Sequence, residues 1–217
     1  MRKLFFTALL LVMILNAYAQ QDITKFMGIP VDGSKSEMIK KLEKKGFKYD
    51  YRNDYLTGEF NGYNVEVHIF TNNNKVYRIC LVDRSWLNEI DIKIRFNDLC
   101  TQFEKSGRYM PIDLINDNHL TDNDDISFQI QVENKRIEAD YCQIDSYDKV
   151  VNYLTNYQYD FSPNIADTTK WMADFYSIYL EHFSKRLVWF MIADQNNKYK
   201  ILMFYDNLYN QANGEDL

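Results

Sequence analysis

The sequence contains only one long apolar run, at residues 4–15 near the N-terminus. Two basic residues, at 2–3, precede the run, and Ala-Tyr-Ala at 17–19 follows it. This is the order of a secretory signal peptide with its cleavage site. The run is too short to span a bilayer, which takes about 20 residues, and no second run follows. We therefore expect a signal peptide over 1–19, cleaved after Ala19, and an exported mature chain in the periplasm or outside the cell, without a transmembrane segment.

Cysteine is also scarce, with only Cys80, Cys100 and Cys142. None lies near the predicted cleavage site, so a lipid anchor is not expected there. Three cysteines in an exported chain allow at most one disulfide and leave one thiol over. Cys100 is predicted to be a core thiol, because it shares a helical stripe with Phe96 and Phe103. Cys80 and Cys142 can pair only if their strands lie close together, and the sequence leaves that question open.

Positive charge is outnumbered by negative charge, with 25 Lys and Arg against 31 Asp and Glu. Loss of the signal peptide would make the balance more acidic still. An acidic balance argues against nucleic acid and anionic membranes as partners, because both reward Lys and Arg. The chain also has 17 Tyr and 14 Phe, too many aromatic residues for a disordered protein. A folded chain of one domain or two small domains is expected.

Contiguous catalytic and metal-binding motifs are missing. The sequence has no G-x-S-x-G, no H-E-x-x-H and no cysteine beside a histidine. The acidic stretch at 116–125 includes His119, but it lacks the spacing and the closing glutamate of a calcium loop. No second His or Cys stands at ligand spacing from His119. We therefore predict a solvated loop, no metal and no cofactor, although catalytic groups that meet only in space would leave no such pattern.

The stretch GIPVDGSKS, residues 28–36, comes close to the phosphate-binding loop G-x-x-x-x-G-K-[ST]. Its two glycines have the right spacing, but Ser34 stands where the lysine belongs, and no buried apolar strand precedes it. Ser34 and Glu37 instead fit a capping box, in which each side chain accepts a hydrogen bond from a backbone N–H at a helix start. Apolar residues then recur at helical spacing up to Gly46, a natural helix stop. The sequence predicts a capped helix and no nucleotide site.

A three-stranded meander is predicted after this helix. Asn61-Gly62 lies between two alternating runs, as in a type I′ hairpin, and sets Leu56 opposite Val67. For the next connection, a three-residue loop at 72–74 sets Val67 opposite Ile79, whereas a loop of two or four residues would set apolar residues opposite polar ones. The residues expected to face the helix are Leu56, Val65, Val67, Ile69, Tyr77, Ile79 and Leu81.

The opposite face of the meander carries the candidate binding residues Tyr55, Glu66, His68 and Arg78. Glu66 and His68 are neighbours on one strand, and the three-residue loop places Arg78 directly across from His68. The set offers a base, a carboxylate and an anion holder. A solvated sheet face with charge pairs worth roughly 0.2–1 kcal/mol each explains the same pattern, and a flat face offers no water-excluded cleft. We therefore expect these residues to bind rather than catalyse, and we expect His68→Ala and Arg78→Ala to cost less than about 1 kcal/mol of stability each.

The fold class predicted is α+β, with antiparallel meander sheets and helices packed on one face. Two consecutive units are expected: residues 20–83, a helix plus the meander, and residues 84–217, a larger helix-plus-antiparallel-sheet unit that can merge with the first into one domain. The elements expected in the second unit are a helix over 92–106, a hairpin over 126–142 that turns at Asn134-Lys135, a short helix within 147–154, a helix over 168–184 and a closing hairpin over 187–205. In the hairpin over 126–142, Phe128, Ile130 and Val132 are expected to share a face with Ile137, Ala139 and Tyr141.

Two stretches carry a resemblance, KFMGIPVDGSKSEMIKKLEKKGF and the terminal ILMFYDNLYNQANGEDL. They resemble uncharacterised exported proteins of Bacteroides-type gut bacteria. The first helix and meander are also similar to the helix-plus-sheet unit of beta-lactamase-inhibitor-like proteins and of small outer-membrane assembly lipoproteins. The chain departs from the lipoproteins in having no lipid-accepting cysteine. The resemblance implies a module that binds proteins through its sheet.

Three functions remain open at this point. A non-enzymatic binding or envelope-assembly module fits the lack of catalytic motifs and the polar sheet faces, and its partner would be another envelope or secreted protein. A glycan-binding protein fits the many tyrosines, tryptophans and asparagines. An exported hydrolase is the third, if its catalytic groups meet only in space.

Overall fold

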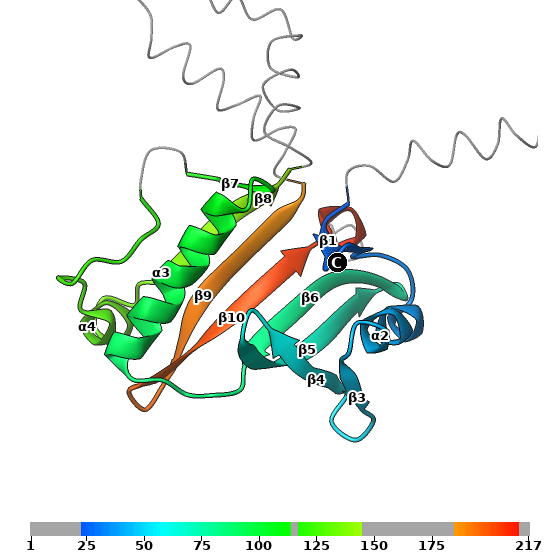
Figure 1. Ribbon diagram of the computed structural model, residues 1–217, viewed down its shortest axis with the longest axis horizontal. Helices are drawn as coiled ribbons and strands as arrows, with labels where there is room; N and C mark the ends of the chain where they lie inside the picture. Colours follow the sequence, from blue (N-terminus) through cyan, green and yellow to red (C-terminus); the bar gives the residue numbers. More distant parts are fainter. Residues whose placement is uncertain (1–22, 114–116, 145–184, 213–217) are drawn as a thin grey trace, which may run out of the picture.

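The computed structural model describes residues 23–113, 117–144 and 185–212, and its fold is a large antiparallel sheet with a few helices (Figure 1). This α+β class is the predicted one, although the sheet dominates. The helices are α2 (Lys35–Glu43), α3 (Glu89–Lys105), α4 (Ile126–Gln131) and the 3₁₀ turn η2 (Leu208–Asn210). The strands are β1 (Lys25–Phe26), β2 (Ile29–Pro30), β3 (Lys48–Asp50), β4 (Tyr55–Phe60), β5 (Tyr63–Asn72), β6 (Lys75–Asp83), β7 (Tyr109–Pro111), β8 (Glu138–Gln143), β9 (Leu187–Gln195) and β10 (Lys198–Asp206).

Eight strands form one sheet in the order β3-β4-β5-β6-β10-β9-β8-β7, and β1 and β2 form a separate two-stranded pair. The first four strands follow the chain. The last strand, β10, then pairs with β6, so that it joins the first meander to the later strands. In the described residues, the strands of both expected units therefore lie in one sheet.

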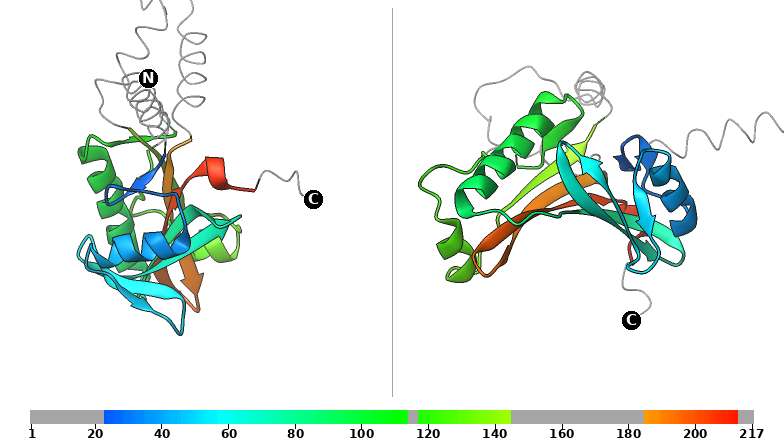
Figure 2. Two further views of the ribbon diagram at one scale, coloured as in Figure 1. Left: turned by 90° about the vertical axis from the view of Figure 1, so that its right-hand side faces the viewer. Right: turned by 60° about the horizontal axis from the view of Figure 1, so that its bottom comes forward.

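Side-chain alternation gives the sheet two different faces. We call the face that carries α2 and α3 the inner face, and the opposite one the outer face; the right-hand view of Figure 2 shows both helices on the same side of the curved sheet. The inner face is apolar and buried against these helices, which places the core between them and the sheet. Its central residues include Val67, Leu81, Met203, Phe190 and Ala139, which lie in one row across five strands.

The capped helix predicted after Gly33 is confirmed. Ser34 is the N-cap of α2; its hydroxyl accepts a hydrogen bond from the backbone N–H of Glu37, and the Glu37 carboxylate accepts one from the backbone N–H of Ser34. Lys35, the residue nearest to a P-loop lysine, instead pairs with Asp54, with 2.6 Å between Nζ and Oδ2. Gly46 has a φ of 98° just after the helix, a conformation that favours glycine.

Replacing the cap is expected to destabilise the protein. Ser34→Ala removes the acceptor for the backbone N–H of Glu37, so the free energy of unfolding should fall by about 0.5–2 kcal/mol. Urea denaturation measures this loss. The matched change Ser36→Ala, two residues along the same helix, should cost less. Equal losses for the two variants would contradict a specific capping role.

The first hairpin has the predicted register. Asn61 and Gly62 have φ values of 50° and 78°, as a type I′ turn requires, and Leu56 pairs with Val67. Gly58 also has a role in packing, because a Cβ at this position would lie 2.4 Å from Cδ1 of the Phe47 ring.

The second connection of the meander differs from the prediction. Asn72 pairs with Lys75, so the turn has two residues, Asn73 and Asn74, rather than three. A two-residue turn alone would invert the alternation, but the register shifts at Phe70/Thr71 through a β-bulge. The bulge adds one residue and restores the alternation, which is why the parity argument gave the wrong loop.

The bulge changes the pairing of β5 with β6 without turning its side chains over. Val67 pairs with Leu81 rather than with Ile79, and Ile79 pairs with Ile69. These four residues are buried, as predicted. Tyr77, which was also predicted to face the helix, is only half-buried.

The hairpin predicted over 126–142 is wrong in its first arm, because residues 126–131 form α4. The alternation of Phe128, Ile130 and Val132 suggested a strand, but the side chain of Asp125 accepts a hydrogen bond from the backbone N–H of Phe128 and caps a helix. Ile126 is the buried anchor of this helix, whereas Phe128 and Val132 are exposed. The second arm is confirmed as β8, with its three predicted apolar residues buried.

Two other predictions in this part of the chain have different outcomes. The closing hairpin is confirmed as β9 and β10, joined by a turn at Asn196-Asn197. The helices predicted within 147–154 and over 168–184 lie outside the described residues.

The cysteines are thiols and form no disulfide with one another. Cys80 lies on β6 and Cys142 on β8, and β10 and β9 separate these strands, so the pairing left open by the sequence does not occur. Cys100 is buried on α3, as predicted. Burial raises the pKa of the Cys80 and Cys100 thiols to about 12, so neither is a thiolate nucleophile at neutral pH.

Candidate functional site

Three of the four predicted binding residues lie together on the outer face. The ring centroids of Tyr55 and His68 are 5.4 Å apart, and His68 Nε2 lies 3.7 Å from Glu66 Oε2. Arg84, which the sequence analysis did not select, lies on the other side of Glu66, with 3.6 Å between Nε and Oε1. The strands β4 and β5 place these side chains at the edge of the outer face. They form a half-exposed polar patch.

The fourth predicted residue, Arg78, is not across from His68. The bulge sets Cys80 opposite His68, and Arg78 instead lies beside Asp206 of β10. Its guanidinium binds this carboxylate in a bidentate manner, with 2.6 Å from Nε to Oδ1 and 2.7 Å from Nη2 to Oδ2. These hydrogen bonds raise the pKa of Arg78. The predicted exposed cation is therefore part of a largely buried ion pair.

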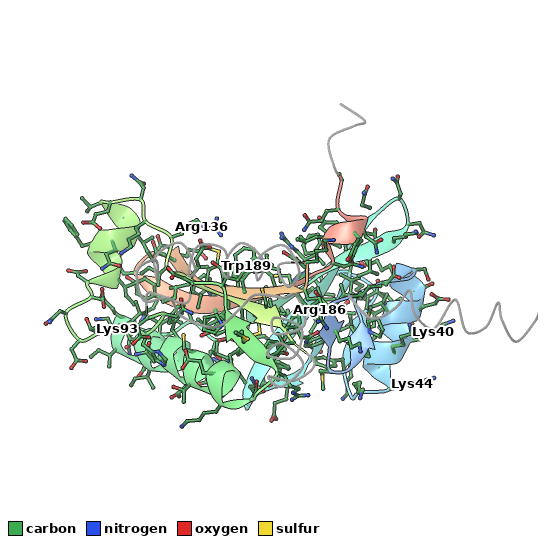
Figure 3. All side chains as sticks on the ribbon, turned by 90° about the horizontal axis from the view of Figure 1, so that it is seen from above. Lys40, Lys44, Lys93, Arg136, Arg186 and Trp189 are labelled. Carbon is green, nitrogen blue, oxygen red and sulfur yellow. The ribbon has the colours of Figure 1, made fainter. Side chains whose placement is uncertain are left out.

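The centre of the outer face is an aromatic and cationic cluster. Trp189 and Phe204 stack with their ring centroids 4.1 Å apart, and the Arg78 guanidinium carbon lies 5.0 Å from the Phe204 centroid. The Trp189 indole N–H donates a hydrogen bond of 3.0 Å to Asp206. Arg136 lies 5.3 Å from the Trp189 centroid, and Figure 3 shows both residues on the side of the sheet away from Lys40 and Lys44 of α2. We call Arg78, Arg136, Trp189, Phe204 and Asp206 the outer-face cluster.

Charged groups surround this cluster along β8. Arg136 Nη2 lies 2.6 Å from Glu138 Oε2, and Asp140 pairs with Trp189 in the sheet. Burial, followed by the negative charge of Glu138, raises the pKa of Asp140. The cluster therefore has an apolar centre and a charged rim.

Sequence reasoning missed most of the cluster. The alternation in LVWFMIADQ does place Trp189 opposite in direction to Val188 and Phe190, which is a signal for an outward tryptophan. The register that brings Trp189 to Arg78 runs through β10 and β6, and nothing in the local sequence specifies it. Asp206 looked like the first residue of a polar tail.

His119, in the loop that begins at residue 117, forms a second polar arrangement with Thr101 of α3. Its Nδ1 lies 2.7 Å from Asp117 Oδ1, and its Nε2 lies 3.2 Å from Thr101 Oγ1. A hydroxyl, an imidazole and a carboxylate in this order are the groups of nucleophilic catalysis. Here they lie at the surface, where the Asp117 side chain is 77% exposed, and Asn97 makes two hydrogen bonds of 2.8 Å with the backbone of Leu120. The hydrogen bonds of Thr101 with His119 and of Asn97 with Leu120 hold the loop after residue 117 against α3.

Within 23–113, 117–144 and 185–212, no three His, Cys, Asp or Glu side chains converge as metal ligands. No helix among these residues is both long enough and apolar enough to cross a bilayer.

Comparison of the chain with protein-family models, with curated proteins and with solved structures finds no match.

Proposed function

We propose that this protein is an exported, non-enzymatic binding or envelope-assembly module that holds a partner protein on the outer face of its sheet. The observation that carries the proposal is the outer-face cluster, a stacked Trp–Phe pair with two arginines at the centre of the sheet. Tyr55, Glu66 and His68 would extend this surface toward β4. In this proposal the module consists of two consecutive helix-plus-sheet units, residues 20–83 and 84–217, whose described strands share one sheet.

The composition of the cluster supports a protein partner. Tryptophan, tyrosine and arginine are the residues that most often dominate the binding energy of protein interfaces, and they do so near the centre of the interface. The side chains are also held in place before binding, because Arg78 and Trp189 both donate hydrogen bonds to Asp206. Preorganised side chains lose less conformational entropy when a partner binds.

The same geometry favours a protein over a glycan. Sugar rings bind proteins by stacking on an open aromatic face. Trp189 already stacks on Phe204 and lies near the guanidinium groups of Arg78 and Arg136. A partner carboxylate or backbone carbonyl can still reach the exposed edge of Arg136, whose side chain is 57% exposed. We therefore place an acidic or carbonyl-rich protein surface against this face.

Site-specific photo-crosslinking in cells that export the protein tests the proposal. A photoreactive residue replaces Met191 or its cross-strand neighbour Leu202 on the outer face, or Lys40 or Lys44 on α2 as matched controls on the other side of the molecule (Figure 3). We expect the two outer-face positions to capture the same protein and the α2 positions not to capture it. The captured protein is then purified, and its affinity is measured with the wild type, with Arg136→Glu and with Lys44→Glu.

The two charge reversals give the decisive comparison. Arg136→Glu is expected to weaken the purified complex at least about tenfold, or 1.4 kcal/mol, whereas Lys44→Glu leaves it unchanged. Equal effects of the two reversals, or capture from the α2 positions only, would exclude the outer face as the binding surface. Binding to a neutral oligosaccharide on a glycan array, lost in Arg136→Glu, would replace the proposal with the glycan alternative.

A further inference from the structure

A pocket of about 680 Å³ lies away from the outer-face cluster, between the C-terminal end of α3 and the β1–β2 pair. Its walls come from parts of the chain that are far apart in sequence: Lys25 of β1, the β4–β5 turn, the end of α3, the start of β7 and the ends of β8 and β9. In Figure 1, β1, the upper end of α3 and β7 surround the same end of the sheet. The volume lies within the range of about 300–1,000 Å³ that is common for small-molecule sites.

The charge of this pocket is opposite to that of the chain. The protein carries a formal net charge of −6, yet Lys25, Arg108 and Arg186 all line the pocket. None of the described residues that line it carries a carboxylate. Lys25 and Arg108 form no ion pair with any residue in the described part of the chain. Lys25 and Arg108 therefore place two positive charges in one concave site with no carboxylate beside them among the described residues, and an anionic ligand would relieve their mutual repulsion.

The remaining lining residues supply hydrogen bonds and aromatic surface. The side-chain amide of Gln143 fixes β1 at the pocket, since it accepts a hydrogen bond of 2.7 Å from the backbone N–H of Lys25 and donates one of 2.9 Å to its carbonyl. Asn61 and Gln102 form a 3.1 Å hydrogen bond that joins the β4–β5 turn to α3. The rings of Phe103 and Tyr109 pack against each other at an interplanar angle of 37°, with their centroids 4.4 Å apart.

Tyr205 is a buried tyrosine that lines the pocket. Burial raises the pKa of the Tyr205 phenol, and its hydrogen bond with Tyr109 raises it further, whereas the positive charge of Arg108 lowers it. Arg108 and Tyr205 both line the pocket.

We propose that this pocket binds a small organic anion of about the size of a monosaccharide, whose carboxylate or phosphate group contacts Lys25 and Arg108. The hydroxyl groups of such a ligand would meet the amides of Asn61 and Gln102, and its apolar side would lie against Phe103. This site is separate from the outer face, so it adds a ligand to the proposed binding module and does not depend on it.

Isothermal titration of the purified protein with four probes tests the site. Glucuronate and glucose 6-phosphate offer a carboxylate and a phosphate on a sugar, glucose offers the sugar alone, and inorganic phosphate offers the anion alone. We expect at least one of the sugar anions to bind with a Kd of about 1 mM or tighter, and glucose and inorganic phosphate to bind at least about tenfold more weakly. Whichever sugar anion binds identifies the anionic group preferred.

Arg108→Gln and Lys25→Gln, tested one at a time, should each weaken this binding at least about tenfold. Lys44→Gln, an equal loss of charge on α2, should leave it unchanged. Because neither pocket cation has an ion-pair partner in the described residues, both variants should unfold at the temperature of the wild type. The proposal is overturned if neither sugar anion binds, if inorganic phosphate binds as tightly as they do, or if both pocket variants bind like the wild type.

Discussion

Arg78→Ala is expected to lower the free energy of unfolding by about 2–4 kcal/mol, well above the loss that its sequence context suggests. The substitution removes both hydrogen bonds to Asp206, whose side chain is only 1% exposed. A buried carboxylate that loses its cation pays the cost of desolvation without compensation. The loss stays moderate because the Arg78 side chain is 27% exposed and Trp189 still donates to the carboxylate. Urea denaturation at neutral pH measures it.

Arg136 offers a matched control on the same face. Arg136→Ala removes the same side chain, but Arg136 is 57% exposed and pairs with a partly exposed glutamate, so a loss below about 1 kcal/mol is expected. Replacing the Arg78 partner as well, in Arg78→Ala/Asp206→Asn, should recover part of the stability, because no buried charge is then left. If Arg78→Ala and Arg136→Ala cost the same, Arg78 is solvated and the pair with Asp206 does not form.

Arg95→Ala is expected to have the largest effect, about 3–5 kcal/mol. Arg95 projects from α3 into the core, where it is 2% exposed, with its Nε 3.3 Å from Asp83 Oδ2 and its guanidinium carbon 3.6 Å from the Tyr63 ring centroid. One of its nitrogens, Nη1, has no hydrogen-bond partner. The pair is therefore incompletely compensated, and removing the arginine leaves Asp83 as a charge in the core.

The pH dependence of this variant provides a second measurement. Burial raises the pKa of Asp83, and the charge of Arg95 partly offsets that rise. Because the folded pKa lies above the unfolded one, the unfolded state gives up the proton first, and stability falls as pH rises from the unfolded value through the folded one. Loss of Arg95 raises the folded pKa further, so Arg95→Ala should lose stability over a wider pH range than the wild type.

A double replacement separates the charge from the packing. Arg95→Met/Asp83→Asn keeps side chains of similar size without a buried charge, and it should be more stable than Arg95→Ala. A pH profile of Arg95→Ala that matches the wild type, or a double variant no more stable than the single one, would show that Asp83 is not the charge left behind.

Local features of this protein follow from its sequence. The capping box of Ser34 and Glu37 and the turn at Asn61-Gly62 each depend on atoms within a few residues of one another. The stripe that buries Phe96 and Phe103 depends only on the helical repeat of α3. Short-range hydrogen bonds and backbone preferences are enough to specify such elements, and the structure has them where the sequence predicts them.

The candidate site is determined by longer-range partners. The bulge at Phe70 sets the register of β5 against β6, and a loop count cannot reveal it, because a bulge reverses the parity on which the count relies. The same ambiguity affects α4, since Ile126 and Ile130 fit a helical repeat as well as a strand-like alternation does. Asp125 decides between the two by capping the helix.

The sheet order and the buried ion pairs were decided only in three dimensions. Arg78 and Asp206 are separated by 128 residues, and they meet because β10 pairs with β6 rather than with a strand nearer in sequence. Arg95 looks like a solvent-facing residue on an amphipathic helix until Asp83 lies opposite it. A charge can be buried only where its partner is held, and that depends on how distant strands pack together.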